Sequence, residues 1–304
     1  MHDLKGNLLV RISAYLKTVN WITLFSILVT VVLWASSFVG IRAALYDYSP
    51  GHLALLRYIV ASIVLLVGCF WMPLRMPLRQ DVPALIGLGF LGIALYNVAL
   101  NYGEQTVPAG IASFLVNTAP VFTTLLAIIF LGEKIKKGGW VGIFTGFVGA
   151  AIISFSLAGD GQFTFNWGAA LILLAALVQA IYFVIQKSFL ERYKPLELTA
   201  YTIWGGTVCL FIYLPGLKES IQVAPIASTL AIVYLGVFPG VLGYVAYAYA
   251  LSKMPASKVT NFLYLVPVTT LPLAWFWLGE WPGSVALLGG LIALAGVIVV
   301  TMKG

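Results

Sequence analysis

Long apolar stretches separated by short polar connectors follow one another along the whole chain. Each stretch is close to the roughly 20 residues that a helix needs to cross the hydrocarbon of a bilayer. The pattern predicts ten membrane-spanning helices and leaves no room for a soluble domain. The predicted helices cover residues 21–45, 51–72, 83–103, 108–131, 138–157, 167–190, 197–214, 227–250, 255–279 and 283–302.

The same pattern occurs twice in the chain. Residues 112–133 align without a gap with residues 259–280 at an offset of 147 positions, and both segments hold a central proline and end in Leu-Gly-Glu. The first two helices of each copy align at an offset of 145. We therefore expect an all-α polytopic membrane protein with two five-helix repeats, residues 21–157 and 167–304, joined by the loop 158–166.

An odd number of helices per repeat means that the second repeat starts on the opposite side of the membrane from the first. The repeats should therefore be inverted. Because Lys and Arg gather in cytoplasmic loops, the loop charges predict the orientation. The side that would carry both termini holds Lys5, Arg11, Lys17, Arg75, Arg79, Lys134, Lys136, Lys137, Lys187, Arg192, Lys194, Lys253, Lys258 and Lys303, against Arg42 and Lys218 on the other. We expect both termini in the cytoplasm and the chain in the inner (cytoplasmic) membrane.

Composition agrees with a membrane environment. Hydrophobic residues make up 61% of the chain and charged residues 9%, whereas soluble domains carry roughly 25% charged residues. The mean hydropathy is +1.01. The net charge of +7 is spread over many loops, so it reports orientation and does not indicate nucleic-acid binding.

The pattern of apolar residues also gives expectations for the N-terminal segment and for the two cysteines. Residues 1–20 place apolar side chains on one helical face, which suits an amphipathic helix on the cytoplasmic surface, with a frayed tail as the alternative. Cys69 and Cys209 lie inside predicted spans and are not repeat equivalents, so they are expected to be small apolar core residues.

The motifs along the chain resemble a known family. Helix 1 contains Trp-Ala-Ser-Ser-Phe-Val-Gly at 34–40, helix 2 contains Leu-Ala-Leu-Leu-Arg-Tyr at 53–58, and helices 4 and 9 combine a mid-span proline with a terminal Leu-Gly-Glu. In order and spacing these resemble the EamA-type branch of the drug/metabolite transporter superfamily. The resemblance implies export of small metabolites, amino acids among the commonest, by alternating access. No cofactor is expected.

Polar and aromatic residues form stripes on helices 1, 3, 4, 6, 8 and 9. A polar side chain facing lipid costs free energy, so such stripes should face protein or water. They predict a central solute cavity between the repeats; the alternative is hydrogen bonding between packed helices. The candidate substrate-binding residues are Trp34, Ser37, Asn97, Asn101, Ser113, Asn117, Gln179, Tyr182, Tyr244, Tyr247, Thr260 and Tyr264.

Two prolines interrupt these striped helices. Pro120 and Pro267 each free a backbone carbonyl one turn earlier and bend the helix. They are candidate hinges, with a static kink as the alternative.

Charged residues near the predicted outer rim are candidates for a gate or an ion pair. Arg57 needs a partner, which Glu104 or Asp47 could supply; we favour a structural ion pair over recognition of a substrate carboxylate. Arg42 and His52 could close a gate at the same rim, although ordinary interfacial placement is the favoured interpretation.

Glu133 and Glu280 end helices 4 and 9, close to the start of the next helix. We expect them to cap helices 5 and 10, with proton coupling as the sharper alternative. Glycines repeated along helices 5 and 10 indicate close packing, against a helix of the same chain or against another protomer. The chain is accordingly expected to be a monomer or a homodimer.

Several kinds of site are missing from the sequence. No Asp or Glu lies in the middle third of a predicted span, and no phosphate-binding loop, metal-ligand spacing or catalytic triad is present. Facilitated diffusion or exchange of a small-molecule solute is therefore favoured. A flippase for an amphipathic lipid head group is the alternative, and a membrane-embedded enzyme is a weaker one.

Overall fold

The computed structural model describes residues 20–131, 137–156, 166–254, 259–260 and 262–303. Every regular element within these ranges is helical. The predicted N-terminal segment 1–19, Glu133 and the connecting loop as far as residue 165 lie outside the described residues.

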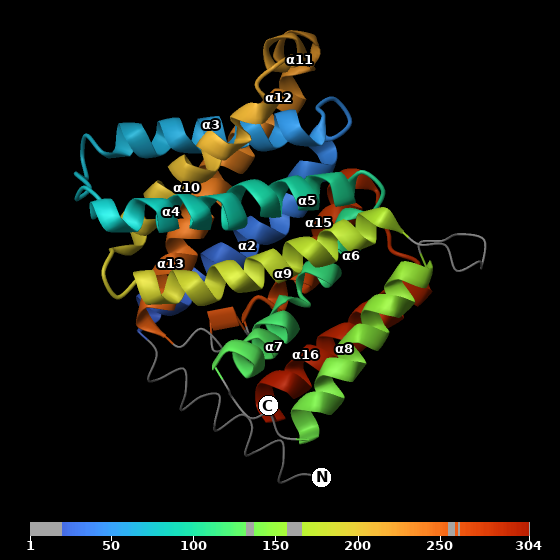
Figure 1. The fold of residues 1–304 in the computed structure, drawn as a ribbon. Helices are drawn as coiled ribbons and strands as arrows, with labels where there is room; N and C mark the ends of the chain where they lie inside the picture. The colour runs from blue at the N-terminus through green and yellow to red at the C-terminus, as the bar shows by residue number, and fades with distance from the viewer. Residues whose placement is uncertain (1–19, 132–136, 157–165, 255–258, 261, 304) are drawn as a thin grey trace.

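The described residues of the first half form seven α-helices besides a short 3₁₀ turn at Arg79–Asp81 and a π-helical segment, and Figure 1 shows their arrangement. They are α2 (Trp21–Ala44), α3 (Pro50–Gly68), α4 (Val82–Gly89), α5 (Tyr96–Glu104), α6 (Ala109–Val116), α7 (Ala119–Leu131) and α8 (Lys137–Ser156). A π-helical segment, η2 (Phe90–Leu95), joins α4 to α5.

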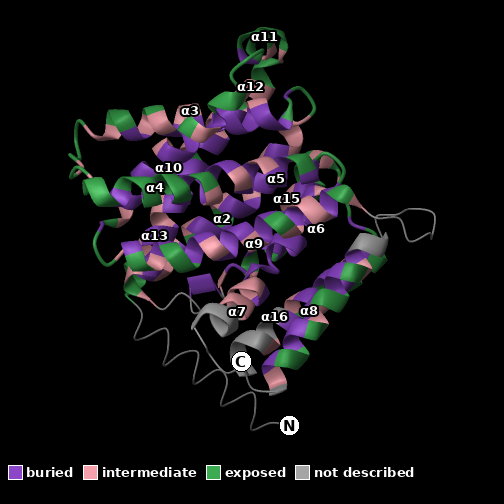
Figure 2. Ribbon diagram, in the orientation of Figure 1, coloured by how far each residue is buried: buried purple, intermediate pink, exposed green. Residues whose placement is uncertain are grey.

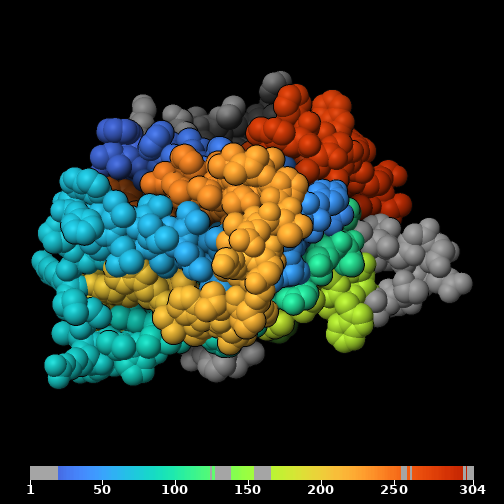
Figure 3. Space-filling view, turned by 90° about the horizontal axis from the view of Figure 1, so that it is seen from above, coloured from blue at the N-terminus to red at the C-terminus, as the bar shows by residue number. Residues whose placement is uncertain are grey.

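The described second half follows the same order with one addition. Its helices are α9 (Trp167–Phe189), α10 (Pro195–Leu210), α12 (Ile226–Leu235), α13 (Tyr244–Lys253), α15 (Leu265–Leu278) and α16 (Ser284–Lys303). A π-helical segment, η4 (Gly236–Gly243), joins α12 to α13. The addition is a short helix, α11 (Leu217–Val223), which begins after Gly216 at φ 79°; with α12 it covers the middle of one face of the molecule (Figure 3).

Six described helical segments are long and apolar enough to cross a membrane. They are Trp21–Ala44, Pro50–Gly68, Arg79–Glu104, Trp167–Phe189, Pro195–Tyr213 and Ile226–Lys253. Four shorter apolar helices, 109–123, 138–153, 265–278 and 284–296, fall in the remaining predicted spans. The chain is an all-α, multi-span membrane protein.

Local sequence explains where the long helices begin. The Asn20 side chain accepts a hydrogen bond from the Ile22 amide, and the Asn166 side chain caps α9 in the same way through Ala169. Pro50 and Pro195 stand in the first turns of α3 and α10, where a missing N–H costs nothing. These caps satisfy amide groups that have no partner inside their own helix.

The two π-helical segments lie at equivalent places in the repeat. A π turn frees carbonyl groups from the regular α-helical ladder, and both segments use such a group between helices. The Gly92 carbonyl of η2 accepts from the Tyr244 hydroxyl at 3.3 Å, and the Gly243 carbonyl of η4 accepts from Thr30 at 3.4 Å.

The helices that contain Pro120 and Pro267 are each interrupted by a turn just before that proline. Residues 117–118 form a turn between α6 and α7, ahead of Pro120, and residues 263–264 form a turn ahead of Pro267. The proline ring clashes with the carbonyl four residues earlier, which explains the position of each break.

Helices α8 and α16 lie side by side, at the lower right of Figure 1. A Cβ on Gly149 would come within 2.3 Å of the Ala293 amide nitrogen, and one on Gly296 within 2.3 Å of the Gly146 nitrogen. The two backbones are therefore in direct contact, and the described glycines of these helices pack within the chain. The buried residues gather where the other helices meet, as Figure 2 shows in purple.

Candidate functional site

A pocket lies where helices from both halves converge. About 570 Å³ of space within it, including its opening to solvent, is not filled by protein atoms. The lining residues come from α2, α3, α5, α6, α7, α9, α13 and the residues around α15. They are Trp34, Ser37, Phe38, Arg57, Tyr96, Leu100, Val116, Asn117, Ala119, Pro120, Gln179, Tyr244, Thr260, Leu263 and Val266.

Five of the predicted substrate-binding stripes contribute to this pocket. Trp34 and Ser37 come from α2, Gln179 from α9 and Tyr244 from α13. Asn117 stands at the break between α6 and α7, and its amide donates to the Ser113 carbonyl at 3.0 Å. Thr260 and Pro120 complete the set of candidates that line it.

Aromatic rings form one wall. The ring of Trp34 lies 5.4 Å from that of Tyr244 and 5.0 Å from that of Tyr247, and it stacks on Phe183 at 6.1 Å. The indole Nε1 of Trp34 is buried and has no hydrogen-bond partner among the described residues. The wall therefore combines a large apolar surface with an unused donor.

Arg57 brings a positive charge to the pocket. Its side chain is only 3% exposed, and its Nη1 donates to the Asn97 amide oxygen at 3.0 Å. The Asn97 amide nitrogen in turn donates to the Tyr58 hydroxyl at 2.8 Å. Asn97 thus orients the Arg57 side chain through this hydrogen bond. Asn97 itself is not among the lining residues.

The expected ion pair of Arg57 is not among those found in the described part of the chain. The Asp47 carboxylate accepts from the Ser228 hydroxyl, and both carboxylate oxygens of Glu104 are buried without a hydrogen-bond partner there. Arg57 lies two turns inside α3, which places it beyond the short Asp47 side chain; its contact is the amide of Asn97 instead.

The other predicted substrate-binding residues lie outside the pocket lining. Asn101 donates to the Pro50 carbonyl at 3.1 Å, and the Ser113 hydroxyl donates to the Gly110 carbonyl at 2.6 Å. Tyr182 and Tyr247 belong to the aromatic cluster behind Trp34. Tyr264 packs against the pair Val121 and Ile143; the turn at 263–264 changes the register of the stripe to which Tyr264 belongs.

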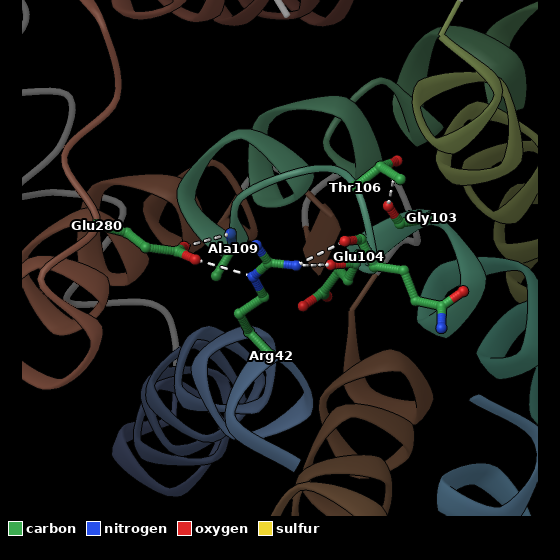
Figure 4. Close-up of polar contacts among 7 residues, drawn as sticks. Arg42, Gly103, Glu104, Thr106, Ala109 and Glu280 are labelled. Atoms are coloured by element: carbon green, nitrogen blue, oxygen red, sulfur yellow. Dashed lines mark hydrogen bonds and ion pairs between the residues drawn. The ribbon is translucent and has the colours of Figure 1, made fainter. Parts of the chain in front are cut away.

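At one end of the bundle an ion pair connects the two halves, as Figure 4 shows. The Arg42 Nε lies 2.8 Å from Glu280 Oε1. The Arg42 Nη1 also donates to the backbone carbonyls of Glu104 and Gln105, the latter at 2.9 Å. Glu280 Oε2 accepts from the Ala109 amide at 3.0 Å.

These contacts correct the expected role of Glu280. The sequence predicts a cap on the next helix, α16, but the carboxylate caps α6, which belongs to the other half. A carboxylate at a helix N-terminus stabilises the free amides and opposes the positive end of the dipole. At the same end, His52 is held by the Pro215 carbonyl at 3.0 Å and the Ser220 hydroxyl at 2.8 Å, so it anchors the segment around α11.

In the second repeat, Lys187 makes one contact that corresponds to a contact of Arg42. Its Nζ donates to the carbonyls of Leu251, at 2.5 Å, and Met254, at 3.2 Å. Leu251 is the repeat counterpart of Glu104, and Lys187 that of Arg42. The alignment at the 145 offset could have identified this pairing, although hydropathy alone could not.

The Lys187 end of α9 carries a second polar cluster. Arg192 Nη1 pairs with Asp81 at 3.1 Å, and the Tyr193 hydroxyl donates to the other Asp81 oxygen at 2.7 Å. Burial, followed by the hydrogen bond to Asp81, raises the pKa of Tyr193. The phenol therefore stays protonated and connects the end of α9 to the start of the Arg79–Glu104 span.

Comparison with known proteins decides the family. The profile of the EamA-like transporter family matches residues 21–155 and again residues 166–302. The chain belongs to the EamA-like transporter family. The family domain therefore occurs twice, once in each half, and this EamA chain is a transporter.

Curated relatives agree with the assignment. The EamA chain is 43% identical over 272 residues to the "Uncharacterized transporter YdfC" of Bacillus subtilis, covering 89% of this chain and 88% of that protein. It is 39% identical over 279 residues to a "Probable terminal-alkyne amino-acid exporter" of Streptantibioticus cattleyicolor, covering 92% and 93%. A solved structure with 16% identity has a TM-score of 0.63 over 92% of this chain and 96% of that one; it supports the fold alone.

Proposed function

We propose that this EamA transporter exports small amphipathic metabolites, amino acids or closely related compounds, by alternating access through the pocket between its two halves. The observation that carries the proposal is the composition of the pocket, whose polar groups Asn117, Gln179 and Ser37 come from both halves and face an aromatic wall. A small polar set on a mostly apolar surface suits a solute with one polar end. A relative that is 39% identical bears the name of an amino-acid exporter.

The proposal includes the membrane arrangement. Ten helices form two inverted repeats, residues 21–157 and 167–304. The protein lies in the inner membrane, and both of its termini are in the cytoplasm. Inversion supports alternating access, because it gives the two ends of the bundle equivalent contacts that can open in turn when the halves rock. The contacts of Arg42 with the Glu104 carbonyl and of Lys187 with the Leu251 carbonyl form such an equivalent pair, and both are closed in this structure.

Exchange or facilitated diffusion supplies the driving force in this proposal. None of the pocket-lining residues is Asp or Glu, so the pocket offers no carboxylate for a bound proton or sodium ion. Pro120 and Pro267, which follow the two helix breaks, are the proposed hinges of the rocking motion.

Transport in proteoliposomes tests the function. Purified protein is reconstituted with an unlabelled amino acid inside, and entry of the labelled amino acid is followed for a panel of polar, branched and aromatic side chains. Counterflow should appear for a subset of the panel and should persist after the pH gradient is collapsed. No counterflow with any member, together with movement of fluorescent phospholipids between leaflets, would favour a lipid flippase instead.

A further inference from the structure

Arg57 is a buried cation without an acidic partner in the described part of the chain. The ion pairs found there are Arg42–Glu280 and Arg192–Asp81. The Nε of Arg57 is buried and has no hydrogen-bond partner, while Nη1 is held by Asn97. Burying a charge that makes no direct ion pair costs free energy, so the position of Arg57 in the pocket wall needs an explanation.

Neutral groups contact the guanidinium and orient it; the buried Glu104 interacts with its charge electrostatically but forms no ion pair with it among the described residues. The guanidinium carbon lies 5.3 Å from the centre of the Tyr58 ring, and Asn97 bridges the Arg57 Nη1 and the Tyr58 hydroxyl. These neutral groups fix the plane of the side chain. Because Nε has no partner, the guanidinium still has donor capacity in a group that lines the pocket.

The positive charge is also confined to one half. Thr202 is the repeat counterpart of Arg57, and its hydroxyl is engaged with the backbone of its own helix at Leu198. Among the pocket-lining residues Arg57 is the one charged side chain. The pocket lining therefore has a single positive charge, contributed by α3.

From this geometry we infer that Arg57 binds the carboxylate of the transported solute, and that the solute class is monocarboxylates with an apolar side chain. The inference rests on the proposed transport function. A planar guanidinium pairs with a carboxylate in a fixed geometry, and the one cation of the pocket lining, which contains no Asp or Glu, matches a single negative charge. The aromatic wall around Trp34 and Tyr244 receives the apolar part of the solute.

The pocket offers a charged partner to a carboxylate but none to an amino group. With no Asp or Glu in the lining, an ammonium group meets only neutral acceptors such as Asn117 and Gln179. The carboxylate is therefore required for binding, and the amino group is dispensable. In a transporter that recognises both charges of an amino acid, removal of the amino group would weaken binding.

Matched ligand sets separate the two charges. Each set keeps one apolar group: leucine, 4-methylpentanoate and 3-methylbutylamine form the first, and phenylalanine, 3-phenylpropionate and phenethylamine form the second. Binding to the purified full-length protein is measured as the ligand-dependent rise in melting temperature over a concentration series. Within a set, the amino acid and the acid should bind with affinities that agree within several-fold, and the amine should bind at least about tenfold more weakly.

Variants then assign the carboxylate preference to Arg57. Arg57→Gln should abolish the preference for the acid over the amine, and Arg57→Lys should retain part of it because the charge stays while the planar fork is lost. Arg79→Gln removes an exposed cation outside the pocket and should leave the preference intact. Each variant is first required to elute as a single species; if Arg57→Gln fails this requirement, the wild-type ligand sets and Arg57→Lys decide.

Three results would overturn the inference. They are equal binding of amines and acids, a preference for acids that survives in Arg57→Gln, and no stabilisation by any of the carboxylates. Transport in proteoliposomes distinguishes this failure from failure of the proposed function. Counterflow that does not depend on a carboxylate would support the transport function but contradict carboxylate binding by Arg57. Absence of all counterflow would contradict the proposed function itself.

Discussion

Arg42 and Glu280 form an ion pair across the two repeats, with 2.8 Å between Nε and Oε1. Both side chains are largely shielded from solvent, with exposed fractions of 21% and 17%. The same carboxylate accepts the Ala109 amide, so one side chain of the second half holds both α2 and α6 of the first. This contact is the clearest connection between the halves at that end of the bundle.

The first prediction concerns this contact. Glu280→Ala removes the ion pair and the cap of α6, and it should lower the free energy of unfolding by about 1–3 kcal/mol. Arg42→Gln should cost less, because the cap remains. The melting temperature of the purified protein is the measurement, and a double-mutant cycle between the two positions gives the coupling.

Exchange of the two charges is a control for that cycle. Arg42→Glu combined with Glu280→Arg restores opposite charges but leaves the Ala109 amide without an acceptor. The exchanged protein should therefore be less stable than wild type. Full recovery of stability would mean that the cap contributes nothing.

The second prediction concerns glycine packing between α8 and α16. Gly149→Ala places a methyl group within 2.3 Å of the Ala293 amide nitrogen, so it should destabilise the protein by about 1–3 kcal/mol. Gly87→Ala is the matched control, since nothing lies within 4 Å of its new methyl group and alanine favours the helix by about 1 kcal/mol. The two variants should shift the melting temperature in opposite directions; equal shifts would contradict the packing.

The third prediction concerns Asn117. Asn117→Leu keeps a similar volume but removes the amide from the pocket, so counterflow should fall by about tenfold or more while the protein stays folded. Val208→Leu is the control, because Val208 is 63% exposed on α10, away from the pocket. A variant that transports at the wild-type rate would remove Asn117 from the site.

The fourth prediction concerns membrane orientation. In a Cys69→Ser, Cys209→Ser background, single cysteines at Tyr46 and Lys218 should react with a membrane-impermeant maleimide added to intact cells. Cysteines at Arg79 and Lys194 should react only after the membrane is opened. Labelling of both pairs from the same side would contradict the inverted arrangement.

Much of the helical architecture can be predicted from hydropathy and the internal repeat. The expected helix 167–190 is observed as Trp167–Phe189 and the expected helix 21–45 as Trp21–Ala44, because asparagine caps and long apolar runs define their ends. The π-helical segments were not predicted. Gly89 and Gly236 stand at equivalent places beside them, but glycine has many other uses in packed helices.

The candidate site was harder to predict because breaks in the helices change which residues share one helical face. A stripe at i, i+4 and i+7 assumes an uninterrupted α-helix, and η2 and the breaks near residues 117 and 263 change that register. Tyr96 therefore lines the pocket although its neighbour Asn97 belongs to the predicted stripe. Tyr264, the repeat counterpart of Asn117 and expected to line the same cavity, packs against Val121 and Ile143. The role of Glu280 was missed because its partner Ala109 is distant in sequence.

One measurement tests the central claim, that the solute occupies the pocket between the two halves. Ser37→Cys, in the background without other cysteines, places a thiol in the pocket lining, and Lys218→Cys places one on the exposed surface of α11, outside the membrane spans. The rate of thiol labelling is measured in proteoliposomes with and without a transported solute. The account predicts that the solute slows labelling at position 37 and leaves position 218 unchanged. An unchanged rate at position 37 under saturating solute would contradict it.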